Sequence, residues 1–252
     1  MKRAIFAALA VALVGSAHAQ SLSVVPNANT NVGGAFGLST PISSGDRTLQ
    51  MIISASQLTS MVNGQLTGLT FRLDGPEVAS KPLVPISFTN YDIFLGQAAV
   101  VPLGASATFA DNYILGTKTQ LRSGALSLAA GYFPNTSPNP NAFAAIINFN
   151  LGSYTYTGGD LVLELSHSGN SATDFALDAV ENSAAFAAHG AAGYNSSTST
   201  DINSVTDSLN VVHVLAPVVQ IQFTGAPEPG TLALIGLGAL ALATRRRRVA
   251  LR

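Results

Sequence analysis

The chain has 252 residues, of which 47% are hydrophobic and only 10% are charged, whereas an average soluble domain has about 25% charged residues. Seven of the 12 basic residues lie in the first three or the last eight positions, so the region between them has five basic against 13 acidic residues, a net charge of −8. A negative field of this size excludes nucleic-acid binding. The absence of cysteine excludes disulfides, thiol catalysis and cysteine-based metal sites.

The first 19 residues follow the order of a secretory signal peptide: a positive start, an apolar stretch and a small-x-small cleavage site. The matching residues are, in order, Lys2 and Arg3, the apolar residues 4–14, Ala17, Ala19 and Gln20. We expect a signal helix over residues 1–19, export through the Sec translocon, and cleavage by signal peptidase before Gln20. A buried N-terminal helix is the alternative interpretation of the same apolar stretch.

Residues 20–225 contain several windows that alternate apolar and polar residues with the period of two that is typical of half-buried strands. The windows with this pattern are residues 69–73, 91–95, 147–151, 161–165 and 219–224. Turn-forming glycine, proline and asparagine separate them. The pattern predicts a mostly β single domain, an antiparallel β-sandwich or jelly roll, in which each strand has one face on the core and one in water.

Two stretches of this domain depart from the alternating pattern. Residues 20–44 are rich in asparagine and glycine, and they predict either a loose arm or an edge strand. Residues 178–192 are rich in alanine, which favours one short helix.

The sequence contains no recognisable catalytic motif. Neither the nucleophile pattern G-x-S-x-G nor the zinc pattern H-E-x-x-H is present. His167, His189 and His213 are far apart in the sequence; we interpret His213 as a surface residue of a strand and His167 as a turn cap. We therefore expect a protein that is not an enzyme and that has no catalytic residue, resident metal or cofactor.

Two small clusters are the weak candidates for a binding site. On a helix, Asp174, Asp178 and Glu181 would share one face; they would then either contribute to a calcium site or, as we favour, form a solvated acidic face. On a strand, Tyr154 and Tyr156 would share one face, either as an exposed aromatic pair or as core and edge packing, which we favour.

The last 27 residues combine a proline-containing motif, an apolar stretch and an arginine cluster. The prolines of the motif favour an extended, exposed segment, and the apolar residues 231–243 would form a helix of about 20 Å, short for a hydrocarbon core of about 30 Å. The arginines would stay on the cytoplasmic side as a stop-transfer block. The residues of motif and block are Pro227, Glu228, Pro229, Arg245, Arg246, Arg247 and Arg248.

This order of features resembles the PEP-CTERM sorting domain of exported proteins in Gram-negative bacteria, over residues 226–252. The resemblance implies recognition by exosortase, a membrane enzyme, and a short transmembrane helix that anchors the protein transiently in the inner membrane before it reaches the cell surface or the extracellular matrix. A plain membrane anchor that no enzyme processes is the alternative. The chain would then consist of a signal peptide (1–19), a β-domain (20–225) and a sorting tail (226–252).

Three functions remain for the β-domain. The first, which we favour, is a non-enzymatic component of the exopolysaccharide or biofilm matrix, because sorting tails of this kind are typical of species that make exopolysaccharide. The second is a carbohydrate-binding module, and the third is a secreted hydrolase, which would need a pocket with paired carboxylates or a serine–histidine contact.

Overall fold

The computed structural model describes residues 20–136, 139–170, 173–181, 191–196 and 215–225. Within these residues the regular structure consists of β-strands and short 3-10 helices. The strands are β1 (Gln20–Val25), β2 (Phe36–Leu38), β3 (Arg47–Ile53), β4 (Gln65–Phe71), β5 (Ile86–Phe88), β6 (Tyr91–Gln97), β7 (Thr119–Arg122), β8 (Leu126–Leu128), β9 (Ile147–Asn148), β10 (Tyr154–Thr155), β11 (Leu161–His167), β12 (Leu177–Glu181), β13 (Ala191–Ser196), β14 (Leu215–Pro217) and β15 (Val219–Thr224). The 3-10 helices are η1 (Asn27–Asn29), η2 (Thr40–Ile42), η3 (Ala55–Gln57), η4 (Thr59–Met61), η5 (Pro102–Gly104) and η6 (Phe109–Asn112).

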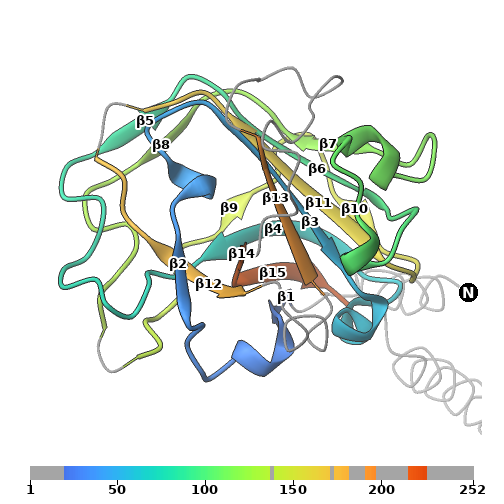
Figure 1. Cartoon of the computed structure of the whole chain (residues 1–252), viewed down its shortest axis with the longest axis horizontal. Coiled ribbons are helices and arrows are strands. Elements are labelled where there is room, and N and C mark those ends of the chain that lie inside the picture. Colours follow the sequence, from blue (N-terminus) through green and yellow to red (C-terminus); the bar gives the residue numbers. More distant parts are fainter. Residues whose placement is uncertain (1–19, 137–138, 171–172, 182–190, 197–214, 226–252) are drawn as a thin grey trace, which may run out of the picture.

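Two five-stranded antiparallel sheets organise the described part of the chain (Figure 1). The first sheet has the order β1-β15-β4-β10, with β9 also paired to β4, and the second has the order β13-β3-β11-β6-β7. We call them the β15 sheet and the β11 sheet, after a long inner strand of each. Two smaller antiparallel sheets, β14-β12-β2 and β5-β8, complete the fold.

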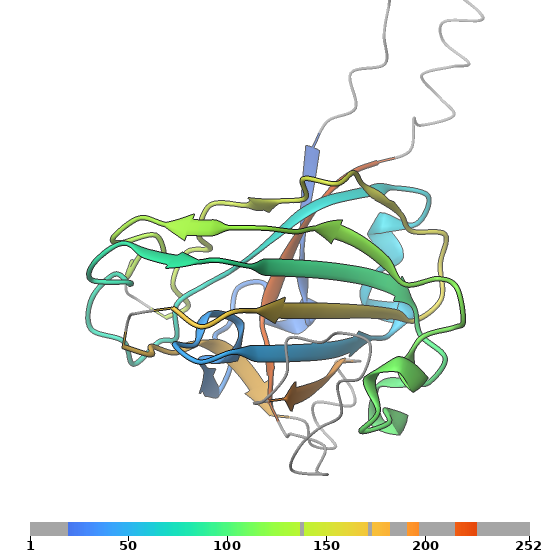
Figure 2. The same cartoon turned by 90° about the horizontal axis from the view of Figure 1, so that it is seen from above.

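The two large sheets share one apolar core. Met51 of β3, Phe71 of β4 and Leu161 of β11 are all fully buried in the same cluster. Figure 2 shows β15 running across the long strands of the β11 sheet. The side chains that fill the core come from alternate positions of the strands, as the period-two patterning requires.

Most predicted strands are confirmed, and the two described ends of the segment considered for a short helix are strands, whereas residues 182–190 lie outside the described residues. The windows at 69–73, 91–95, 161–165 and 219–224 lie largely within β4, β6, β11 and β15, whereas the window at 147–151 holds only the two-residue strand β9. Within 178–192, residues 178–181 belong to β12 and residues 191–192 to β13. There the pairing of β12 with β2 and β14, and of β13 with β3, overrides the helix propensity of alanine.

The N-terminal segment is confirmed as an edge strand, because β1 ends the order of the β15 sheet. The predicted signal helix and the predicted transmembrane helix lie outside the described residues. In the part of the chain that the structure describes, no helix is long and apolar enough to cross a membrane.

Candidate functional site

The two ends of the β-domain lie side by side. β1 pairs antiparallel with β15 over its full length, from Gln20 opposite Thr224 to Val25 opposite Val219. The residue that would follow signal cleavage is therefore the direct neighbour of the last residue of the last strand. Figure 2 shows the start of β1 and the end of β15 leaving the domain at the same place.

The start of β4 and its preceding turn complete this end of the domain. Thr224 also pairs with Gln65 of β4, which in turn pairs with Thr155 of β10. In the turn, Asn63 has a left-handed backbone with φ of 62°. A Cβ atom at Gly64 would lie 2.9 Å from the carbonyl oxygen of Met61 and 3.0 Å from that of Thr224, so the turn fits against β15 only with glycine at this position. We call residues 20–22, 62–65, 153–155 and 223–225 the processing pole.

Neutral hydrogen bonds connect the strands on the outer face of the pole. Gln65 donates through Nε2 to Oγ1 of Thr155 at 2.8 Å, and Ser153 donates through Oγ to Oε1 of Gln65 at 2.7 Å. Farther along β15, Thr67 donates through Oγ1 to Oε1 of Gln222 at 3.0 Å. No side chain of the processing pole is charged.

Only two residues separate the end of β15 from the predicted sorting motif. Gly225 and Ala226 stand between Thr224 and Pro227. The three residues from 225 to 227 reach at most about 10 Å when fully extended. The folded β-domain therefore stays next to the motif for as long as β15 is paired.

The tail itself matches a known family. Residues 226–248 match the PEP-CTERM protein-sorting motif. This chain carries a PEP-CTERM sorting motif. The match covers the predicted motif residues Pro227, Glu228 and Pro229 and extends through the arginine block. The protein is thus an exported substrate of exosortase that is anchored transiently in the membrane before release. No curated protein and no solved structure matches the chain.

Of the predicted processing residues, Gln20 lies among the described residues. It is the exposed first residue of β1. The other predicted ones, namely Ala17, Ala19, Pro227, Glu228, Pro229, Arg245, Arg246, Arg247 and Arg248, lie outside the described residues. The pairing of Gln20 with Thr224 was missed from the sequence, because no local pattern relates two strands that lie about 200 residues apart.

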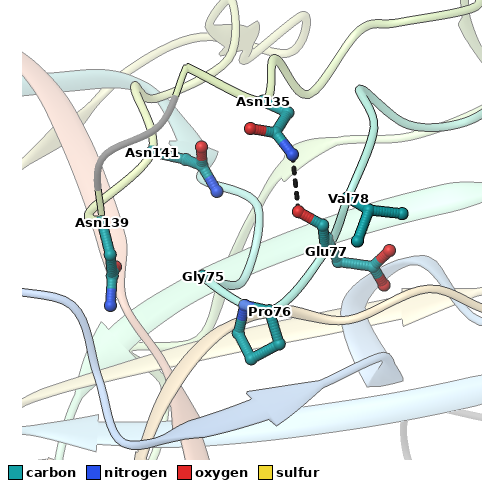
Figure 3. A pocket seen from close by; sticks show the side chains of 7 residues that line it. All are labelled: Gly75, Pro76, Glu77, Val78, Asn135, Asn139 and Asn141. Atoms are coloured by element: carbon teal, nitrogen blue, oxygen red, sulfur yellow. Dashed lines mark hydrogen bonds between the residues drawn. The ribbon is translucent and has the colours of Figure 1, made fainter.

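The β-domain also has a pocket of about 350 Å³ at the end of β4 opposite the processing pole (Figure 3). It is lined by Gly75, Pro76, Glu77, Val78, Asn135, Asn139 and Asn141. Several of its polar groups already form hydrogen bonds within the protein. Asn135 donates through Nδ2 to the carbonyl oxygen of Glu77 at 2.5 Å, and Asn141 donates through Nδ2 to the carbonyl oxygens of two residues after β4 at 3.2 and 3.1 Å. These amides hold the surrounding loops together.

The outer face of the β11 sheet contains a buried polar cluster. Glu164 of β11 is fully buried. Its Oε1 lies 2.8 Å from Nζ of Lys118, while Oε2 accepts hydrogen bonds from Tyr113 Oη at 3.1 Å and from Gln50 Nε2 at 3.0 Å. Burial, together with the negative charge of Glu164, raises the pKa of Tyr113 well above its usual value, so the hydroxyl stays a donor. A carboxylate held in this way is a structural group and has no access to a substrate.

A second buried ion pair corrects the predicted acidic face. Asp178 lies on β12, where its Oδ2 is 2.6 Å from Nε of Arg72 and its Oδ1 accepts the backbone N–H of Gly34 at 2.7 Å. Asp174 instead accepts the backbone N–H of Ser44 at 2.6 Å. The helical acidic face is therefore wrong, because Asp178 and Glu181 lie on strand β12 and Asp174 lies in the irregular segment before it. Among the described residues, no group of three or more histidine, cysteine, aspartate or glutamate side chains is placed to hold a metal ion.

Among the remaining sequence candidates, Tyr156 and His167 are buried. Tyr156 is buried and donates through its hydroxyl to the carbonyl oxygen of Gly159 at 2.6 Å, while Tyr154 packs half-buried against the same core, so the favoured interpretation of core packing is confirmed over an exposed aromatic pair. His167 is the buried last residue of β11, where it stacks on Tyr91 with ring centroids 5.6 Å apart. His189 and His213 lie outside the described residues.

Proposed function

We propose that the β-domain of this exosortase substrate is a non-enzymatic component of the exopolysaccharide matrix. Export and exosortase sorting follow from the tail, and the proposal concerns what the domain does afterwards. Its destination on this account is the cell surface or the matrix around it.

The observation that carries the proposal is the direct fusion of the sorting tail to a domain in which the two carboxylates buried most deeply, those of Glu164 and Asp178, are bound by groups of the fold. Glu164 is held by Lys118, Tyr113 and Gln50. Asp178 is held by Arg72 and Gly34. A glycosidase needs two carboxylates facing each other across an accessible cleft, and these two groups hold the fold together instead.

The composition of the domain agrees with a role in a hydrated matrix. Over residues 20–225 it has 12 acidic and five basic residues, a net charge of −7. A net charge far from zero keeps a protein soluble and limits self-association. Serine, threonine, asparagine and glutamine supply much of the remaining polarity, and their hydroxyl and amide groups are suited to hydrogen bonds with sugar hydroxyls.

The test is a fractionation of the host with a tagged full-length chain. A short epitope is inserted between Leu115 and Gly116, because Leu115 is 99% exposed at the tip of a turn. The domain is then followed in membrane, matrix and medium fractions, before and after enzymatic digestion of the exopolysaccharide. The matched control replaces Pro227, Glu228 and Pro229 by alanine.

We expect the tagged protein in the matrix fraction and its release when the polysaccharide is digested, while the control remains in the membrane. Recovery of the processed domain in the medium, with no dependence on polysaccharide, would contradict the matrix role. A change in polysaccharide chain length caused by the purified processed protein would favour a hydrolase instead.

A further inference from the structure

The short spacer forces exosortase to work beside a folded domain. The motif begins three residues after Thr224, and those residues reach at most about 10 Å. An enzyme that holds Pro227, Glu228 and Pro229 in its active site must accommodate the adjoining ends of β1, β4 and β15 at the same time. This step depends on the sorting by exosortase described above and is independent of the matrix role.

The spacer is not easily lengthened by unpairing the last residues of β15. It lies between β1 and β4 and is paired with both of them along its length. Its inward side chains Val219, Ile221 and Phe223 are buried in the main core. Peeling the strand away would expose this apolar surface and break two ladders of backbone hydrogen bonds, which is costly compared with fraying at a chain end.

The pole has the chemistry of a contact surface on an otherwise acidic domain. Its side chains are neutral, and Leu22 and Val62 are exposed on it by 54% and 41%. Charged residues are depleted at the centre of protein–protein interfaces, where apolar side chains and amides make the contacts. The net charge of −7 over residues 20–225 is thus carried by side chains outside the pole.

We propose that the processing pole is part of the recognition surface for exosortase and contacts the enzyme beside the site that binds the motif. Leu22 and Val62 are its apolar contacts, and Gln20, Gln65 and Thr224 supply neutral polar groups around them. The enzyme on this account recognises the motif together with the folded end of the domain that presents it.

The test measures the rate of tail removal from the full chain in its own host, by pulse labelling and electrophoresis. Two variants place a charge on the pole, Leu22→Asp and Val62→Asp. Each is made again with a spacer of eight glycine and serine residues between Gly225 and Ala226. The matched controls are Val62→Thr, which keeps shape without charge, and Val78→Asp, which places the same charge on a 92% exposed residue beyond the opposite end of β4.

We expect Leu22→Asp and Val62→Asp to slow tail removal about tenfold, equivalent to about 1.4 kcal/mol in the barrier, while both controls are processed at the normal rate. The spacer should restore the rate of the charged variants, because it lets the enzyme hold the motif away from the pole. The processing rate is read before release, so a failed matrix role would leave this result unchanged.

Two outcomes would overturn the inference. A normal rate for both charged variants without the spacer would show that exosortase does not contact the pole, and would leave contact with lipid head groups as the alternative use of this surface. A slow rate that the spacer fails to restore would place the defect in folding or export. Limited proteolysis of each variant distinguishes such a folding defect directly.

Discussion

The two large sheets use the same alternating pattern in different ways. In the β15 sheet, β15 alternates buried Val219, Ile221 and Phe223 with half-buried glutamine and threonine. In the β11 sheet, every residue of β11 is buried, although its sequence also alternates. The segment after β6 accounts for part of the difference, because it brings Asn112, Tyr113 and Lys118 to the polar face around Glu164.

The comparison shows that a period of two identifies the core face of a strand and leaves the environment of the other face open. A polar side chain in the second position is compatible with water or with a covered, hydrogen-bonded cluster. We call residues 99–118, the segment after β6, the cover. The first two predictions test whether the β11 sheet depends on the cover in a way that the β15 sheet does not; the other two concern the processing pole at the end of β15 and His167 at the end of β11.

The largest expected effect is the loss of Glu164. In Glu164→Ala, Gln50 and Tyr113 lose their shared acceptor inside the protein and Lys118 loses its ion pair. We expect the free energy of unfolding of the processed protein to fall by about 3 kcal/mol, as measured in urea. The matched substitution in the β15 sheet, Gln222→Ala, should cost less than about 1 kcal/mol, because Gln222 is half-buried with solvent nearby. Equal costs would remove the distinction between the two sheets.

The second effect concerns the attachment of the cover. Asn112 is fully buried, donates to Oε1 of Gln50 at 2.7 Å and accepts the backbone N–H of Ser106 at 2.6 Å. We expect Asn112→Ala to lower the free energy of unfolding by about 2 kcal/mol and to raise proteolysis within residues 99–118. The exposed control Ser153→Ala should change the free energy by no more than about 0.5 kcal/mol. Unchanged proteolysis would mean that other contacts hold the cover.

The third effect lies at the processing pole. In Gly64→Ala, the new Cβ would press on the carbonyl oxygens of Met61 and Thr224. We expect a loss of about 1 kcal/mol and faster amide hydrogen exchange in β15 by mass spectrometry. Gly225→Ala is the control, since a Cβ there meets no atom within 4 Å. If hydrogen exchange in β15 is as slow in the Gly64 variant as in the wild type, the turn before β4 has shifted to accommodate the Cβ and β15 has kept its pairing.

The smallest effect is a pH dependence from His167. Burial lowers the pKa of the imidazole, although the carbonyl oxygens of Thr40 and Ser168 and the charge of Asp46 raise it, while the charge of Arg47 lowers it. The unfolded chain binds the proton more readily than the folded one, so this contribution to stability is complete above pH about 6.5 and is lost as the pH falls through that value toward the lowered pKa. His167→Gln should lose less stability than the wild type between pH 7.5 and 5.5 in urea titrations. A parallel fall in both proteins would assign the pH dependence to other groups.

Much of the fold was predictable from the sequence, because four strands carry a strong alternation over five or more residues. β9 and β10 were harder to predict, since each has only two residues and owes its structure to β4. The strand over Asp178 was mistaken for helix because the decisive contact, with Arg72, comes from more than 100 residues away. Local patterns do not contain such contacts.

The candidate site was likewise predictable only in part. The tail motif was recognisable because its residues are contiguous, and the family match confirms it. The processing pole was not predictable, because it depends on the pairing of β1 with β15 and on a turn that precedes β4. The sequence did indicate the very short spacer before Pro227, and the structure adds that the start of the domain lies at the same place.

The most direct test of the account is the intact mass of the protein in each cell fraction, from hosts with and without exosortase. We predict a mature form of the protein that begins at Gln20 and ends near Pro227 and that is found only in the host with exosortase. A chain that keeps its full tail in the inner membrane in both hosts would contradict exosortase processing and leave a β-domain that is simply anchored.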